Sequence, residues 1–166
     1  HSVRKPLFVV RLQILEAEGG LVCRLSTDRL FRRILYATDF STDALLCIPC
    51  LSWLAAARPE ELIVAHIQDT RRLGDVTEEQ MAEFNRRDTE RLEALKEQFE
   101  RAGFGKVTTV LRTGNAIAEL LELARIREPT LIVMGAKGRT GVREMLLGGV
   151  TETIVHQAPV HVLVMR

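Results

Sequence analysis

A glycine-rich stretch, MGAKGRTGVREMLLGGVTET at residues 134–153, combines residue types that could hold phosphate. Gly135 and Gly138 allow the backbone to turn tightly and to approach a ligand, because no Cβ stands in the way. The first residues of the following helix would present unpaired amide N–H groups, which together form an anion site. These residues are Gly148, Gly149, Val150 and Thr151. The spacing indicates either a phosphate-binding loop or a structural turn between a strand and a helix.

Two other phosphate motifs do not fit this stretch. A P-loop needs four residues between its glycines and then Gly-Lys followed by Ser or Thr, and no window of the sequence supplies that pattern. The dinucleotide fingerprint needs G-x-G-x-x-G after the first strand. Here two residues separate Gly135 from Gly138 and Gly138 from Gly141, and the three glycines follow the fourth strand. The spacing that remains is Gly-x2-Gly-x9-Gly-Gly.

Alternating strand and helix patterns must position this stretch. Short apolar strands are predicted at 33–38, 62–67, 106–113, 130–135 and 160–166. Helical periodicity lies between them, within 39–58, 77–103, 115–128 and 151–157. Apolar strands separated by amphipathic helices predict a doubly wound α/β fold with a parallel sheet covered on both faces. Ligands bind such folds beyond the carboxyl ends of the strands, which is where the glycine-rich stretch begins.

Residues 1–30 do not follow this alternation, so we expect an N-terminal β arm or linker before the α/β domain at 31–166. PLFVVRLQILEA and LVCRLS flank EGG, a pattern typical of two strands joined by a tight turn. KPLFVVR at 5–11 also echoes APVHVLVMR at 158–166. The arm is either the end of a preceding repeat or an ordinary extension. The apolar fifth strand is an edge that invites pairing, with the arm or with a second molecule.

The composition is that of an ordinary globular domain. The chain has 166 residues, of which 46% are apolar and 27% charged, enough for one domain with a full core. A net charge of +1 gives no electrostatic case for nucleic acid. No apolar run is long enough to span a bilayer or resembles an export signal. Three cysteines do not suggest a secreted disulfide framework, so we expect a cytoplasmic protein.

Three segments resemble the universal stress protein family: ILYATDFS at 34–41, LIVAHIQD at 62–69 and VMGAKGRTGVREMLLGGVTETIVHQAPVHVLVMR at 133–166. The resemblance covers residues 33–166 in element order. Gly135, Gly138 and Gly148 match the Gly-x2-Gly-x9-Gly-Ser/Thr motif of ATP-binding members. The resemblance implies a five-stranded parallel sheet in the order 3-2-1-4-5, homodimerisation through the last strand and, in many members, bound ATP.

The same resemblance implies a set of nucleotide-binding residues. Asp39 matches an acidic residue near the adenosine, and Ala37, Ile67 and Met134 match positions that line the adenine pocket. The expected cofactor-binding set is Ala37, Thr38, Asp39, Ile67, Met134, Gly135, Gly138, Arg139, Gly148, Gly149, Val150 and Thr151. ATP is the expected ligand, with ADP or AMP as alternatives and Mg²⁺ on the phosphates.

Gly149 departs from the family motif, which has Ser or Thr at this position. Loss of one hydroxyl to phosphate costs about 1–3 kcal/mol, or about tenfold and more in affinity. Thr151 keeps a hydroxyl nearby, in the same helix. Lys137, Arg139 and Arg143 either compensate for the missing hydroxyl or form a solvated basic loop.

Other candidate residues have structural interpretations. CIPC at 47–50 lies inside the first predicted helix, where Pro49 should produce a kink, so buried thiols are favoured over a redox site. His66 lies near the predicted site and is expected to bond to backbone. Trp53 is expected in the core or at a helix interface, and NRRDTER at 85–91 on a solvated face.

We therefore expect a cytoplasmic stress-response module that binds an adenine nucleotide and regulates rather than catalyses. Any ATP hydrolysis should be slow, because no catalytic base is identifiable. The alternative is a nucleotide-free dimerisation or interaction module of the same fold, which Gly149 favours. Neither a nucleic acid nor a membrane is an expected partner.

Overall fold

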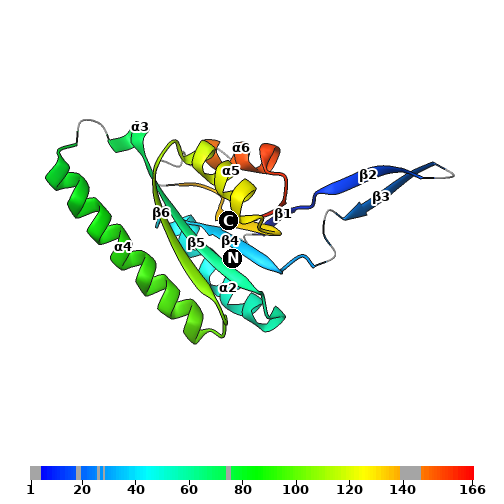
Figure 1. Ribbon diagram of the computed structural model, residues 1–166, viewed down its shortest axis with the longest axis horizontal. Helices are drawn as coiled ribbons and strands as arrows, with labels where there is room; N and C mark the ends of the chain where they lie inside the picture. Colours follow the sequence, from blue (N-terminus) through cyan, green and yellow to red (C-terminus); the bar gives the residue numbers. More distant parts are fainter. Residues whose placement is uncertain (1–4, 18–19, 26, 28, 74–75, 139–146) are drawn as a thin grey trace.

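The computed structural model describes residues 5–17, 20–25, 27, 29–73, 76–138 and 147–166. Figure 1 shows a central sheet with helices on both faces and a β-hairpin that projects away from it. The described strands of the sheet follow the order β1-β8-β7-β4-β5-β6. Their bounds are Leu7–Val9 for β1, Arg33–Ala37 for β4, Glu61–Asp69 for β5, Val107–Gly114 for β6, Leu131–Gly135 for β7 and His161–Met165 for β8.

The sheet differs from the predicted five-stranded sheet because the arm contributes a strand to it. Strands β4 to β8 are all parallel to their neighbours within this group. Across the sheet from β6 to β8, the strands of this group are the third, second, first, fourth and fifth of the group in chain order. β1 pairs with β8 in the antiparallel direction and makes a sixth strand, so the expected strand count was wrong.

The strands are buried on both faces, which explains their near-continuous apolar sequences. On one face Ile34, Leu62 and Leu131 pack with side chains of the helices α2, Cys47–Leu54, and α4, Glu78–Arg101. On the other face Leu35 and Ile63 belong to a second cluster that includes side chains of α5, Ala116–Arg127, and α6, Gly149–Gln157. Alternate residues of each strand therefore serve opposite faces, as a two-residue side-chain period requires.

The helices begin and end close to their sequence signals. They are α1 Thr42–Leu45, α2 Cys47–Leu54, the short 3₁₀ helix η1 Ala55–Ala57, α3 Thr70–Leu73, α4 Glu78–Arg101, α5 Ala116–Arg127 and α6 Gly149–Gln157. Thr77 and Gln80 form the expected capping box of α4. No helix in the described parts of the chain is long and apolar enough to cross a membrane.

The first predicted helix is broken rather than continuous. α1 ends at Leu45 and α2 begins at Cys47. Pro49 explains the position of the break, because a proline ring clashes with the carbonyl four residues earlier, here that of Leu45. Trp53 in α2 is 79% exposed, so the expectation that it lies in the core or at a helix interface was wrong.

The pairing of β1 with β8 has a local two-fold symmetry. Phe8 lies opposite Leu163, Leu7 opposite Val164 and Val9 opposite Val162. In an alignment of LFVVR at 7–11 with VLVMR at 162–166, Leu7, Phe8 and Val9 correspond to Val162, Leu163 and Val164. Phe8 thus pairs with its own counterpart, whereas Leu7 pairs with the counterpart of Val9 and Val9 with that of Leu7. The expectation that the arm forms a strand at this edge is confirmed, and β1 is paired as a second copy of β8 would be.

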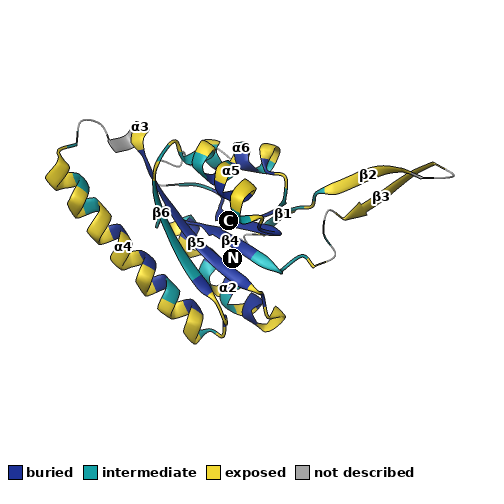
Figure 2. Cartoon of the chain, viewed as in Figure 1, coloured by how far each residue is buried: buried dark blue, intermediate teal, exposed yellow. Residues whose placement is uncertain are grey.

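The rest of the arm is an exposed hairpin. β2, Leu12–Ala17, pairs with β3, Gly20–Leu25, in the antiparallel direction, as the flanks of EGG predict. Figure 2 shows the hairpin almost entirely exposed. Its apolar side chains Ile14 and Leu21 are 69% and 73% exposed. An isolated two-stranded hairpin is marginally stable in water, so β1 and its contacts must do most of the anchoring of the arm.

Arg11 and His161 fasten the arm to the domain. The Arg11 backbone N–H donates to His161 Nδ1 at 2.9 Å. The Arg11 guanidinium donates to the carbonyl oxygens of Ala158, at 3.0 Å, and of Val155, where α6 ends. Burial of the His161 ring, and then the nearby Arg11 charge, lower the pKa of His161 below its ordinary value.

The arm should therefore loosen in acid. The folded protein disfavours the His161 cation. The contribution of neutral His161 to the free energy of unfolding is therefore fully present above about pH 6.5, the pKa of histidine in the unfolded chain, and is lost as the pH drops below that value. Protonation of Nδ1 also removes the acceptor for Arg11. We expect the melting temperature to fall less between about pH 7 and pH 5 in His161→Asn, which keeps an acceptor that does not titrate. His156→Asn, at an exposed position of α6, is the control and should behave as wild type. Equal pH slopes in all three proteins would contradict the assignment.

Candidate functional site

A cavity of about 280 Å³ lies at the carboxyl ends of the parallel strands. It is lined by eleven of the twelve expected nucleotide-binding residues: Ala37, Thr38, Asp39, Ile67, Met134, Gly135, Gly138, Gly148, Gly149, Val150 and Thr151. The twelfth, Arg139, lies outside the described residues, as does Arg143. β4 and β7 are neighbours here although β5 and β6 intervene in sequence, so the cavity lies where the strand order reverses.

One end of the cavity is formed by the start of α6. Gly148 precedes this helix, and among the described side chains none caps it. The Gly148 N–H donates to the Ala136 carbonyl at 2.7 Å, and the first helical bond runs from Glu152 to Gly148. The amides of Gly149, Val150 and Thr151 occupy the first three helical positions, which have no acceptor within the helix. They form a compact set of donors with the positive end of the helix dipole behind them.

Gly135 serves a different purpose from the one that the sequence suggested. A Cβ on Gly135 would lie 2.6 Å from the Ala44 nitrogen and 2.6 Å from the Asp43 carbonyl carbon. The missing side chain therefore makes room for the backbone at the start of α1. Tyr36 holds α1 from the other side, since its hydroxyl donates to the Ala44 carbonyl at 2.7 Å. Close packing of α1 on the sheet, rather than approach of a ligand, explains this glycine.

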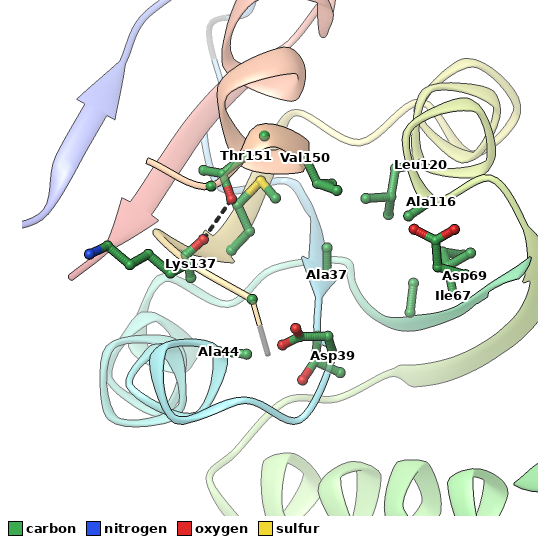
Figure 3. Close-up of a pocket in the computed structure, with 17 residues that line it drawn as sticks. Ala37, Asp39, Ala44, Ile67, Asp69, Ala116, Leu120, Lys137, Val150 and Thr151 are labelled. Carbon is green, nitrogen blue, oxygen red and sulfur yellow. Dashed lines mark hydrogen bonds between the residues drawn. The ribbon is translucent and has the colours of Figure 1, made fainter. Parts of the chain in front are cut away.

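Thr151 does not offer the spare hydroxyl that the sequence suggested as a replacement for the one missing at Gly149. Its side chain is buried, and its Oγ1 donates to the Gly135 carbonyl at 2.9 Å (Figure 3). The hydroxyl proton is thus used to join α6 to the end of β7. The backbone amide of Thr151 still belongs to the start of α6.

Asp39 lies in a tightly bonded turn after β4. Asp39 Oδ1 accepts from the Ser41 N–H at 3.0 Å, and Thr38 Oγ1 accepts from the Phe40 N–H at 3.0 Å. Phe40 has a φ of 58°, in the left-handed region that non-glycine residues seldom adopt. The Thr38 N–H donates to the Ala65 carbonyl at 2.9 Å. These bonds fix the position of the Asp39 carboxylate at the cavity wall.

The other end of the cavity is mainly apolar. Figure 3 shows Ile67, Ala116 and Leu120 beside Asp69, on the far side of Asp39 from Lys137. Asp69 accepts from the Arg71 guanidinium at 2.9 and 2.6 Å. Sequence reasoning missed these lining residues apart from Ile67, together with Ala44 and Ala65. Asp69 had a usable signal, because it ends a buried strand at the same edge of the sheet as Asp39.

The described residues show no second chemical centre. No group of three or more His, Cys, Asp or Glu side chains among them is placed to hold a metal ion. Burial raises the pKa of both thiols in CIPC, Cys47 and Cys50, which disfavours the reactive thiolate. The interpretation of these cysteines as inert side chains agrees with that environment.

The cavity of this doubly wound α/β domain lies at the reversal of strand order, which is where folds of this architecture bind ligands. Residues 30–166 match the model of the universal stress protein family. The chain belongs to that family.

Individual relatives agree with this assignment. The chain is 29% identical over 156 residues to universal stress protein MJ0577 of Methanocaldococcus jannaschii, covering 82% of this chain and 96% of the relative. The solved structure of MJ0577 superposes with a TM-score of 0.72 over 82% of this chain and 96% of that one, at 31% identity.

Two more distant structures share the fold. A universal stress protein in complex with cAMP has a TM-score of 0.62 at 20% identity, over 82% of this chain and 97% of that one. A family member from Arabidopsis thaliana with AMP bound has a TM-score of 0.54 at 17% identity, over 80% of this chain and 90% of that one.

Proposed function

We propose that this protein is a stress-response module that binds an adenine nucleotide, with ATP as the first candidate, in the cavity at the carboxyl ends of the strands. The observation that carries the proposal is the start of α6, where three consecutive amides lie at one end of a cavity whose other end is apolar. A nucleotide has the same division, with an anionic chain at one end and a flat, weakly polar base at the other.

The phosphates belong at the α6 end. The amides of Gly149, Val150 and Thr151 can donate to phosphate oxygens, and the helix dipole favours the negative charge. The base belongs against Ile67, Ala116 and Leu120, with Asp39 between the two ends as an acceptor for ribose hydroxyls. The cAMP and AMP complexes of the two distant relatives support adenine as the base.

Mg²⁺ would accompany the phosphates rather than occupy a site made by protein side chains. The described residues contain no cluster suited to a metal ion, so the ligands would be phosphate oxygens and water. When bound, the ion would neutralise phosphate charge. The chain offers amides that bind and orient, and no described group stands out as a base for hydrolysis, so we propose a regulatory role with at most slow ATPase activity.

A nucleotide-free interaction module is the second candidate, and one observation favours it. Gly149 lacks the hydroxyl of the family motif, and the Thr151 hydroxyl is already bonded to Gly135. The phosphate end therefore depends on amides alone. In this case the cavity would stay empty and the protein would act through its surface.

Release of bound ligand from the purified protein distinguishes the two candidates. We expect denaturation to release an adenine nucleotide that mass spectrometry identifies, and calorimetry on the stripped protein to show binding of ATP, ADP or AMP. GTP is the control for the base. Absence of released nucleotide together with no binding of any of the three adenine nucleotides would overturn the proposal in favour of the interaction module.

Gly149→Ser should tighten ATP binding. A Cβ on Gly149 meets nothing within 4 Å, so the new side chain fits without strain. Its hydroxyl adds one donor to the phosphates, worth about tenfold in affinity. Gly149→Ala is the matched control, because it adds the same Cβ without the hydroxyl and should bind ATP as wild type does. If serine and alanine give equal affinities, the phosphates do not lie at the start of α6.

A homodimer through the last strand remains a proposal and meets an obstacle. β1 occupies the outer edge of β8, which is the edge that such a dimer would use. A second molecule would have to displace β1 or pair beyond it. We also propose a cytoplasmic location, in which adenine nucleotides are abundant and the three cysteines stay reduced.

A further inference from the structure

Three polar side chains are buried behind the cavity, on the face of the sheet that α4 covers. His66 and Gln68 are each 4% exposed and belong to β5, and Asp88 of α4 is 3% exposed. Asp88 lies within NRRDTER, so the expectation of a wholly solvated segment was wrong for this residue. Burial of such groups is costly unless hydrogen bonds or charges compensate, so their arrangement requires an explanation.

The two nitrogens of His66 face two different acceptors. Nδ1 lies 2.7 Å from the Thr38 carbonyl oxygen, and Nε2 lies 3.4 Å from Asp88 Oδ2. A carbonyl and a carboxylate accept protons and have none to give. A neutral imidazole carries one N–H and can satisfy only one of them, whereas the imidazolium satisfies both. The geometry therefore fits the doubly protonated ring.

Neighbouring side chains hold the Asp88 carboxyl group in place. The Gln68 side-chain amide donates to Asp88 Oδ2 at 3.1 Å, and Gln68 is itself oriented by the Thr113 hydroxyl at 3.0 Å. The guanidinium groups of Arg87 and Arg91 lie 3.7 Å from Asp88 Oδ1.

Asp88 of α4 is the charged group nearest to Nε2 in the contacts described above, and Arg87 and Arg91 of the same helix lie beside its carboxylate. Asp39 follows Thr38 in the turn after β4. The Phe40 ring lies 4.6 Å from the His66 ring, tilted by 49°, and the Arg91 guanidinium lies 5.3 Å from the Phe40 ring. His66 is therefore enclosed between helix α4 and the turn that carries Asp39.

Loss of one proton would act on the cavity wall. We expect the remaining proton to stay on Nε2, because the Asp88 carboxylate, 3.4 Å away, attracts an N–H more strongly than the neutral Thr38 carbonyl does. The Nδ1 lone pair then faces the Thr38 carbonyl and repels it. Thr38 and Asp39 line the cavity, and the adjacent Phe40 has a left-handed backbone that persists only while its surroundings enforce it.

We propose that His66 is a positioning residue for the cavity, whose protonated ring holds the Thr38 carbonyl and so couples the Thr38–Phe40 turn to helix α4. As the pH rises and the ring loses a proton, the turn shifts and the cavity binds its ligand less well. The effect on affinity, though not the effect on the turn, rests on the proposed nucleotide function.

The effect on the turn can be measured without any ligand. In NMR spectra recorded between about pH 5.5 and pH 8.5, we expect the His66 ring nitrogens and the amides of Asp39 and Phe40 to change with one common midpoint. Nδ1 should carry a proton at the low end of this range. In His66→Asn the side-chain amide can still donate to the Thr38 carbonyl and does not titrate, so the Asp39 and Phe40 amides should show no such transition. A His66 ring that does not titrate, or amides that titrate equally in the variant, would overturn the proposal.

ATP affinity provides the second readout, by calorimetry across the same pH range. We expect the ATP affinity of wild type to fall about fivefold as the pH rises, the equivalent of one net hydrogen bond. The affinity of His66→Asn should stay close to that of wild type at low pH throughout the range. The exposed His156→Asn controls for the ionisation of ATP and should follow wild type. A wild-type profile in His66→Asn would contradict the role of the ring. If wild type binds none of ATP, ADP and AMP at any pH, the nucleotide proposal fails, and the NMR titration alone decides the role of His66.

Discussion

Replacing Gly135 by alanine should remove ligand binding and lower the stability of the whole domain. The new Cβ would lie 2.6 Å from backbone atoms of Asp43 and Ala44, and backbone cannot move aside as a flexible side chain can. α1 would have to move away from β7, and this movement would displace the wall of the cavity. We expect a loss of about 3 kcal/mol in the free energy of unfolding and at least about 100-fold in ATP affinity.

Gly148→Ala is the matched control for this prediction. Gly148 also lines the cavity, but a Cβ there meets its nearest atom, the Ala136 carbonyl oxygen, at an ordinary 3.5 Å. The stability of the Gly148→Ala protein should stay close to that of wild type. Thermal unfolding and calorimetry with ATP measure both proteins. Wild-type stability in Gly135→Ala would show that α1 is not held as closely as the structure indicates.

Deleting residues 1–28 should make the protein self-associate. The deletion removes β1 and uncovers the outer edge of β8, a strand with the apolar sequence HVLVM. It also removes the exposed apolar hairpin, so association of the shortened protein would report on the β8 edge alone. We expect sedimentation at equal concentration to give a higher average mass than for the intact chain, together with a lower melting temperature. Unchanged mass and unchanged stability would make the arm a passive extension.

Most of the fold was predictable because its signals are local. Apolar runs specify the buried strands, and Thr77 with Gln80 specifies the start of α4. The break before Cys47 follows from Pro49 alone. The attachment of β1 could be anticipated from the echo between its sequence and that of β8, since strands of similar pattern fit the same edge. The count of five strands failed because it was implied by the family resemblance, which covers residues 33–166 and leaves the arm out.

The site was predictable where it depends on backbone and not where it depends on long-range contact. Gly138, Gly148 and Gly149 could be placed at the cavity from spacing. The packing of Gly135 against Ala44 could not be predicted, because these two residues are distant in sequence. The bond from Thr151 to Gly135 and the approach of His66 to Asp88 likewise join separate elements. No local pattern distinguishes these side chains from ordinary helix or strand residues.

The symmetric register of β1 on β8 turns assembly into a competition between a tethered strand and a free one. β1 is joined to the domain by residues 10–32, which include the hairpin, and a tethered segment acts at an effective concentration on the order of millimolar. A second molecule that offers its own β8 presents nearly the same side chains in the same register, and so gains little by complementarity. The intact chain therefore favours its own strand at ordinary concentrations. Conditions that detach Arg11 from His161, acid among them, should shift that balance toward pairing between molecules.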